Sequence, residues 1–260
     1  MKFITGIATD IGKTRASNQD AICMIEAKKL NKTIMMMNVC DGMGGLSKGE
    51  VASATVIKGV EAWFEKELLD VVELCSMEEI RRLWIEKLTE LRNQLNEYGK
   101  REGILLGTTF SGILCCGKNY IWVHIGDSRI YKITLENVVQ ITTDHTIAAR
   151  EAAIGNLTKD QAGCSPLRNK LTQCVGPSKT FIPESGVGTI GKNESILICS
   201  DGFYHTFSKN EMLALNQPQY QSEKSLNRFC QNAIGKVIAR GEQDNVSVAV
   251  LKCERGDAIY

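Results

Sequence analysis

The chain has 260 residues, of which 43% are hydrophobic, and its 31 basic and 30 acidic side chains leave a formal net charge of +1. The two signs are interspersed and form no basic stripe, so we expect no nucleic-acid partner. No Pro-, Ser- or Gly-rich stretch interrupts the chain, which favours a single domain over residues 1–260.

Compartment follows from cysteine usage and from the hydrophobic runs. None of the ten cysteines forms a Cys-x-x-Cys pair, and most lie in apolar runs, as expected of reduced core residues. The first residues lack the apolar core of a signal peptide, and no run is long enough to span a membrane. We therefore expect a cytoplasmic protein with no membrane partner.

Short apolar runs and helical patterns alternate along the chain. Closely spaced runs predict antiparallel strands between residues 3 and 40, and at 109–116, 120–125, 129–134, 138–141, 195–200 and 246–253. Apolar periodicity and capping residues predict helices at 47–69, 76–99, near 208, and at 222–240. Strands that alternate with helices indicate an α+β layered domain. Residues 147–170 lack periodicity and are predicted to be a mobile loop.

Four predicted strands have an aspartate at one end. Asp41 and Asp201 each follow a strand and precede a glycine, Asp127 follows Gly126, and Asp244 precedes the last strand. Burying such anions is costly unless a cation offsets the charge, and carboxylate oxygens suit Mg²⁺ or Mn²⁺. An Asp-Gly pair after a strand is often only a turn. Four such acids together favour a shared metal site.

Eight short segments carry a family resemblance. In chain order they are 15–20 (RASNQD), 39–53 (VCDGMGGLSKGEVAS), 107–109 (GTT), 126–129 (GDSR), 143–145 (TDH), 171–176 (LTQCVG), 200–202 (SDG) and 244–245 (DN). The ordered set resembles the metal-dependent serine/threonine phosphatases of type 2C (PPM), in the form of the bacterial branch. The resemblance implies a four-layer α-β-β-α sandwich in which two packed antiparallel sheets are flanked by helices.

The resemblance also implies a metal-ligand set. Asp41 matches the residue that bridges two metal ions, and the Gly42 carbonyl would bind one of them. Because Gly42 has no side chain, its backbone carbonyl could approach a metal ion closely. Asp201 and Asp244 would complete the protein ligands of the other ion. Asp127 matches a ligand of a third, weaker ion. The implied cofactors are two Mn²⁺ or Mg²⁺ ions, with a third at Asp127.

Substrate contacts are implied in the same way. Arg15 matches the arginine that binds the substrate phosphate, and Gln19 and Asp20 match residues that orient metal-bound water. Met43 stands where many eukaryotic members carry a histidine proposed as general acid, and methionine cannot donate a proton. His205 stands where some members carry an acidic ligand of the third ion.

The implied activity is metal-dependent hydrolysis of phosphoserine and phosphothreonine in proteins by a metal-activated water. We expect a monomer in signalling whose partner is a phosphoprotein made by a serine/threonine kinase. Two alternatives stay open: a phosphatase-fold protein that binds phosphoproteins without turnover, and an enzyme dedicated to one regulatory protein such as an anti-sigma antagonist. Residues 147–170 correspond to the family's flap and are predicted to influence substrate choice.

Overall fold

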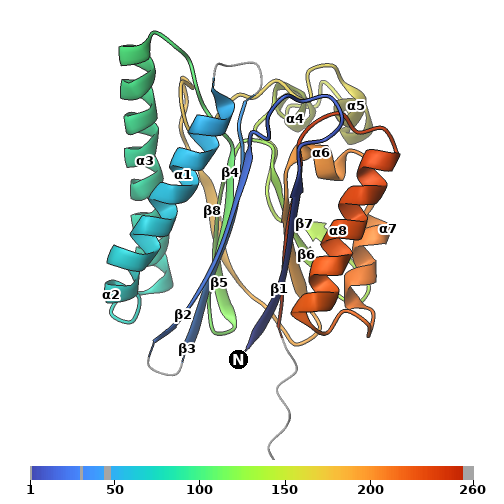
Figure 1. The fold of residues 1–260 in the computed structure, drawn as a ribbon. Helices are drawn as coiled ribbons and strands as arrows, with labels where there is room; N and C mark the ends of the chain where they lie inside the picture. The colour runs from blue at the N-terminus through green and yellow to red at the C-terminus, as the bar shows by residue number, and fades with distance from the viewer. Residues whose placement is uncertain (1, 30–31, 44–47, 254–260) are drawn as a thin grey trace, which may run out of the picture.

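The computed structural model describes residues 2–29, 32–43 and 48–253, which form two antiparallel sheets packed face to face between helices (Figure 1). One sheet has the order β1-β10-β9-β6-β7. Its strands are β1 (Phe3–Asp10), β10 (Val246–Cys253), β9 (Ser195–Cys199), β6 (Arg129–Ile133) and β7 (Val138–Gln140). The other sheet has the order β2-β3-β4-β5-β8. Its strands are β2 (Asp20–Lys29), β3 (Lys32–Asp41), β4 (Phe110–Cys116), β5 (Asn119–Ile125) and β8 (Glu184–Thr189).

The helices form the two outer layers and one end of the sandwich. The helices beside the second sheet are α1 (Gly49–Trp63), which continues through a π-helical turn (Phe64–Leu68) into α2 (Leu69–Val71), and α3 (Met77–Glu102). Those beside the first sheet are α7 (Lys209–Met212), a 3₁₀ turn (Leu213–Asn216) and α8 (Glu223–Ala239). At the end of the sheets lie α4 (Ile147–Ala153), α5 (Lys159–Cys164) and α6 (Asp201–Tyr204) (Figure 1).

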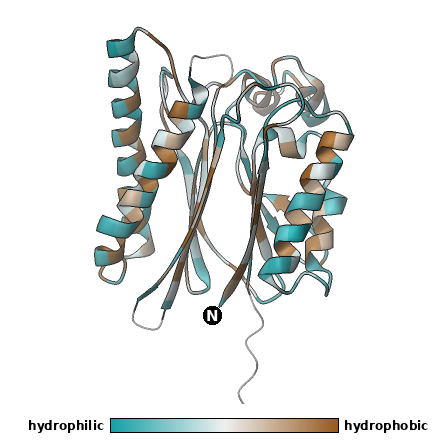
Figure 2. Ribbon diagram, viewed as in Figure 1, coloured by the Kyte–Doolittle hydropathy of each residue, from teal (hydrophilic) through white to brown (hydrophobic). Residues whose placement is uncertain are grey.

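Three buried apolar clusters fill the spaces between these four layers. One lies between the sheets and includes Met37 and Ile198; the others join each sheet to its helices, through Trp84 on α3 and Phe229 on α8. The apolar faces of the helices turn toward the sheets and their hydrophilic faces turn outward (Figure 2). The α-β-β-α sandwich implied by the sequence is confirmed. Within the described residues, no helix is both long and apolar enough to cross a lipid bilayer.

Most predicted helix boundaries agree with the structure. Ser76 caps α3 in a complete capping box with Glu79, and Ser222 caps α8. Ser47, the predicted cap of the first helix, lies outside the described residues. The predicted stop of α3 at Gly99 is wrong, because the helix runs to Glu102 and ends at Gly103, whose φ of 67° is left-handed. Gly99 instead permits close packing, since a Cβ there would lie 2.7 Å from the Ile104 carbonyl oxygen.

Two further segments differ from the sequence-based expectation. Strand β8 was not predicted, because its sequence ESGVGT is rich in glycine. Those glycines face aromatic rings: a Cβ on Gly188 would lie 2.4 Å from Cζ of Tyr120. Residues 147–170, predicted to be a loop, contain the short helices α4 and α5, whose first turns are capped by Thr146 and Thr158.

Candidate active site

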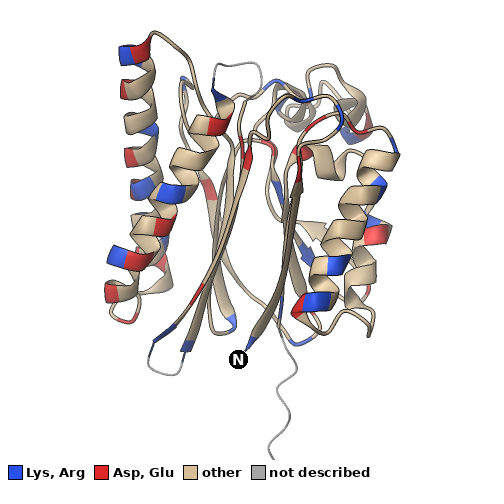
Figure 3. Ribbon diagram, in the orientation of Figure 1, with Lys and Arg blue, Asp and Glu red and all other residues tan. Residues whose placement is uncertain are grey.

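A cavity of about 1040 Å³ opens at the end of the sandwich where the predicted metal and phosphate ligands lie. It is lined by the predicted phosphate ligand, Arg15, and by all the predicted metal ligands: Asp41, Gly42, Asp127, Asp201 and Asp244. Figure 3 shows acidic residues gathered at this end of the strands, between the two sheets. The topology explains the convergence, because Asp41 ends β3, Asp201 begins α6 directly after β9, and Asp244 precedes β10.

Two threonines of the 107–109 segment fix the backbone of Asp41. The Thr109 hydroxyl accepts the Asp41 N–H at 2.9 Å, and the Asp41 carbonyl accepts bonds from the Thr109 N–H (2.8 Å) and the Thr108 hydroxyl (2.8 Å). Asp41 is therefore held on the second sheet, with its carboxylate left for the cavity. Gly126 makes room for this arrangement, because a Cβ there would lie 2.6 Å from the Thr109 side chain.

The structure gives a different reason for the glycine at position 42 from the one expected. A Cβ on Gly42 would lie 2.4 Å from the carbonyl oxygen of Gly49 and 2.7 Å from that of Gln19. The Gly42 N–H also donates to the Gln19 carbonyl at 3.0 Å. Glycine is thus required by tight packing against α1 and the 15–20 segment. The role of its carbonyl as a ligand stays a prediction.

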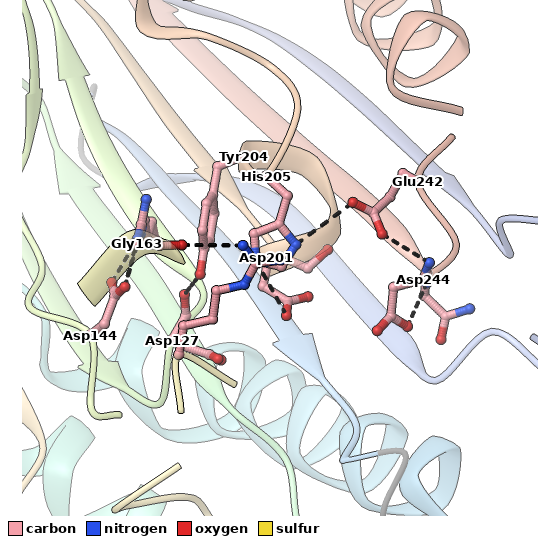
Figure 4. Close-up of polar contacts among 12 residues, drawn as sticks. Asp127, Asp144, Gly163, Asp201, Tyr204, His205, Glu242 and Asp244 are labelled. Atoms are coloured by element: carbon pink, nitrogen blue, oxygen red, sulfur yellow. Dashed lines mark hydrogen bonds and ion pairs between the residues drawn. The ribbon is translucent and has the colours of Figure 1, made fainter. Parts of the chain in front are cut away.

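The carboxylates of Asp41, Asp127 and Asp201 lie close enough together for each to affect the pKa of another. Burial raises the pKa of Asp41 and Asp127 well above the ordinary value, and the neighbouring Asp201 charge raises both further. Burial also raises the pKa of Asp201, whose carboxyl is close enough to Asp41 to share a hydrogen bond. Figure 4 shows Asp127 and Asp201 on either side of Tyr204, whose hydroxyl donates to the Asp127 carbonyl at 3.1 Å.

Asp20 lies behind these acids and does not line the cavity. Its Oδ2 accepts the Ser200 hydroxyl at 2.8 Å, whereas its buried Oδ1 has no hydrogen-bond partner within the described residues. Burial raises the Asp20 pKa to about 7. The Gln19 side chain turns away from the cavity and donates to Glu50 at 3.2 Å. The predicted roles of Gln19 and Asp20 in orienting water stay predictions.

Asp244 is held by Arg15 on one side and by Glu242 on the other. Arg15 binds both carboxylate oxygens of Asp244, and Glu242 Oε1 accepts the Asp244 N–H at 3.2 Å. His205 connects this group to Asp201, because its ring nitrogens lie 3.6 Å from Glu242 and 4.0 Å from Asp201 (Figure 4). The neighbouring His205 lowers the Glu242 pKa to about 2. Sequence reasoning missed Glu242, and its place two residues before Asp244 was the available signal.

Two segments of the resemblance have a structural explanation. Arg129 of segment 126–129 forms a two-pronged ion pair with Asp144 of segment 143–145, at 2.9 and 2.6 Å. The Arg129 guanidinium also stacks on the Tyr204 ring, 3.5 Å from its centroid. Because Tyr204 bonds the Asp127 carbonyl, this ion pair supports the cavity without lining it.

A second group of potential metal donors lies apart from the cavity. His124, His145 and Glu184 place one donor atom each within 4.8 Å of one another. However, both ring nitrogens of His124 already contact Ser111 and a carbonyl oxygen, and His145 Nδ1 accepts the Gly126 N–H. The neutral rings therefore serve as hydrogen-bonded core residues.

The cavity acids have the chemistry of a site for hard divalent cations. All side-chain donors facing the cavity from the four aspartates are oxygens, and burial without a compensating cation raises the pKa of three of them. Asp20 Oδ1, buried behind these acids, has no hydrogen-bond partner among the described residues. The residues present thus fit Mg²⁺ or Mn²⁺.

Comparisons with known proteins define the class of this molecule as a protein phosphatase. The family model described as protein phosphatase 2C matches residues 12–236. The chain therefore belongs to the protein phosphatase 2C family.

Among its relatives, protein phosphatase PhpP of Streptococcus pneumoniae is 29% identical, over 97% of this chain and 98% of its own length. The solved serine/threonine phosphatase of S. agalactiae superposes with a TM-score of 0.85 at 28% identity, covering 97% of this chain and all of that one. The solved structure of serine/threonine phosphatase Stp1 from Staphylococcus aureus superposes with a TM-score of 0.83 at 26% identity, covering 98% of this chain and 96% of that one.

Proposed function

We propose that this protein hydrolyses phosphoserine and phosphothreonine in proteins at a dinuclear metal site held by Asp41, Asp201 and Asp244. The family makes it a protein serine/threonine phosphatase. The observation that carries the site assignment is the convergence of these carboxylates, from three distant segments, on one cavity.

The chain's residues divide the work as follows. Asp41 would bridge two Mn²⁺ or Mg²⁺ ions, the Gly42 carbonyl would bind one of them, and Asp201 and Asp244 would complete the other. Asp127, beside Asp201, would bind a third ion. When bound, such ions polarise a water for attack on phosphorus and offset charge on the phosphoryl oxygens.

Arg15 would bind the substrate phosphate, for which its forked guanidinium is suited. Asp20 and Gln19 would act from behind the ligands, Asp20 by accepting hydrogen bonds from bound water at Oδ1. Met43 lines the cavity but has no ionisable proton, so it cannot protonate the leaving group. The phosphoprotein is expected to come from a serine/threonine kinase, and we place the enzyme in cytoplasmic signalling as a monomer.

The competing function is phosphoprotein binding without turnover. All three central aspartates are present and line the cavity, which favours catalysis. The test is hydrolysis of p-nitrophenyl phosphate and of a phosphothreonine peptide, with Mn²⁺ and with EDTA. Metal-dependent release of phosphate from both is expected. A Mn²⁺-loaded protein that binds the peptide and releases no phosphate would instead be a binder.

A further inference from the structure

The active-site cavity does not end at the aspartates. A second cavity of about 470 Å³ adjoins it along the C-terminal end of α3. The two share Leu105, Pro177 and Ser178 in their walls, and Leu105 is 59% exposed although it is apolar. An extended peptide leaving the aspartate cluster therefore has a continuous path over Leu105.

Charge is segregated along this path. The only carboxylates among the described residues lining either cavity are the four aspartates of the metal site. The remaining walls carry cations, and we call Lys100, Arg150, Lys170 and Lys179, together with Leu105, the cationic groove. Within the described part of the chain, the ammonium groups of Lys100, Lys170 and Lys179 make no hydrogen bond or ion pair. Among the described residues, the Arg150 side chain makes a single ion pair, an exposed contact of 3.4 Å with its neighbour Glu151.

The wall that carries Lys179 is fixed to the body of the protein. Arg92 of α3 donates to the carbonyl oxygens of Gly176 (3.1 Å) and Ser178 (2.7 Å), and its guanidinium lies 4.9 Å from the Phe181 ring centroid. Lys179 thus projects from a backbone that α3 already holds on both sides. A binding group on a fixed backbone loses less conformational entropy when it meets a ligand.

We propose that the cationic groove selects substrates in which glutamate or aspartate residues flank the phosphorylated residue. This inference rests on the proposed function and names the substrate class of the same site. Carboxylates are the partners that unpaired ammonium groups lack here, and the exposed Leu105 offers an apolar contact for the stems of such side chains. The attraction involves exposed charges, so it weakens as ionic strength rises.

The test uses phosphothreonine peptides that differ only in their flanks. One carries glutamates on both sides, one glutamines, one lysines, and one a second phosphothreonine in a glutamine background. The variants are Lys179→Ala, Lys170→Ala and Lys179→Glu. The matched control is Lys192→Ala, which removes an exposed lysine of the β8–β9 connection outside both cavities.

The glutamate peptide is expected to have the lowest KM at low salt. Each Lys→Ala change should raise that KM about two- to fivefold, as for exposed ion pairs, without changing kcat. Lys192→Ala should have no effect, and Lys179→Glu should shift the preference toward the lysine peptide.

Hydrolysis of p-nitrophenyl phosphate separates the two proposals. If this small ester is hydrolysed but the glutamate and glutamine peptides have equal KM, the groove inference is wrong and the proposed function stands. If only the doubly phosphorylated peptide had a lowered KM, the inference that the groove selects carboxylate side chains would also be wrong. If the wild-type protein hydrolysed neither the small ester nor any peptide with Mn²⁺ present, both the proposed function and the groove inference would be wrong.

Discussion

Arg15 grips Asp244 with two parallel hydrogen bonds, from Nε to Oδ1 at 2.7 Å and from Nη2 to Oδ2 at 2.6 Å. The proposed phosphate ligand and a proposed metal ligand therefore hold each other. Each carboxylate oxygen of Asp244 already accepts one guanidinium N–H, so a metal ion at Asp244 would compete with Arg15 for this carboxylate. Displacement would free Arg15 to meet the substrate phosphate.

Replacing Arg15 with alanine separates these roles. Hydrogen bonds to charged groups are worth about 1.5–3 kcal/mol, so kcat/KM for phosphopeptides should fall roughly ten- to a hundredfold. Mn²⁺ affinity measured by calorimetry should not fall, because alanine removes a competitor for Asp244. The Arg15 and Asp244 side chains are 39% and 31% exposed, so the melting temperature should change little. Weaker Mn²⁺ binding by Arg15→Ala would contradict this account. The kcat/KM of Arg15→Lys should lie between those of wild type and Arg15→Ala.

Asp201→Asn should stop catalysis without unfolding the protein. Loss of groups that merely support metal ligands costs 10–100-fold, so loss of a ligand should cost at least about a hundredfold in rate. The variant in EDTA should melt no lower than wild type, because Asp201 is a buried acid beside other acids. Stabilisation by added Mn²⁺ should shrink or vanish. Asp70→Asn, at a side chain 82% exposed, is the control and should behave as wild type. Full activity in Asp201→Asn would rule out the assignment.

The paired histidines make the protein sensitive to acid. Burial lowers the His124 pKa to about 3 and also lowers that of His145, whose ring centroid is 4.9 Å away. Between about pH 6.5 and 3, His124 is protonated in the unfolded chain but stays neutral in the folded protein. Stability is therefore retained above pH 6.5 and lost as the pH falls, by at most about 1.4 kcal/mol per unit for one such group.

The measurement is urea unfolding in EDTA at pH 7.5 and 5.5. Between these two pH values, the free energy of unfolding should fall by about 1 kcal/mol more in wild type than in His124→Gln. At pH 7.5 the variant should be less stable than wild type, because it loses buried hydrogen bonds. Equal losses in the two proteins would show that His124 does not govern the acid response.

Two glycines in different surroundings should respond oppositely to alanine. Gly42→Ala places a methyl group 2.4 Å from the Gly49 carbonyl oxygen, so it should destabilise the protein by about 1–3 kcal/mol and reduce activity by displacing Asp41. Gly235 lies inside α8 with open space around it, so Gly235→Ala should stabilise by about 0.4–1 kcal/mol. Thermal unfolding of both variants decides the matter, and a neutral Gly42→Ala would show that the packing there can yield.

The segment 147–170 is predicted to influence substrate choice. Ile147 and Arg150 at its start and Lys170 at its end line the active-site cavity. Replacing the segment with its counterpart from the pneumococcal relative should change the ranking of phosphoprotein substrates by kcat/KM while leaving hydrolysis of p-nitrophenyl phosphate within a few fold. An unchanged ranking would remove the segment from the specificity determinants.

The sequence predicted most strands and helices because periodicity and capping are local properties, whereas the four-layer arrangement was implied by the family resemblance. Apolar alternation and the Ser76–Glu79 box depend on neighbours within one turn or strand. It failed at β8, where the glycines of ESGVGT are explained only by the rings of Tyr120 and Trp122 on the adjacent strand. Contacts between distant segments carry no local signature.

In the candidate site, too, local patterns could be predicted from the sequence and long-range contacts could not. Aspartates at strand ends were visible as a pattern, and the topology brings them to one cavity. The support of Asp127 by Tyr204 and Arg129, and of Asp244 by Glu242, depends on packing between elements far apart in the chain. The packing requirement at Gly42 was also hidden, because Gly49 approaches it only in the folded protein.

Strand β1 lies at the edge of its sheet and pairs along its whole length with β10, from Phe3 opposite Cys253 to Asp10 opposite Val246. During synthesis, β1 has to wait for β10, which follows it by more than 230 residues, before it has a strand neighbour. Asp244 lies just before β10 in the chain, so the proposed metal ligands are not all in place until β10 has been made. A chain that stops before β10 is therefore expected to lack phosphatase activity.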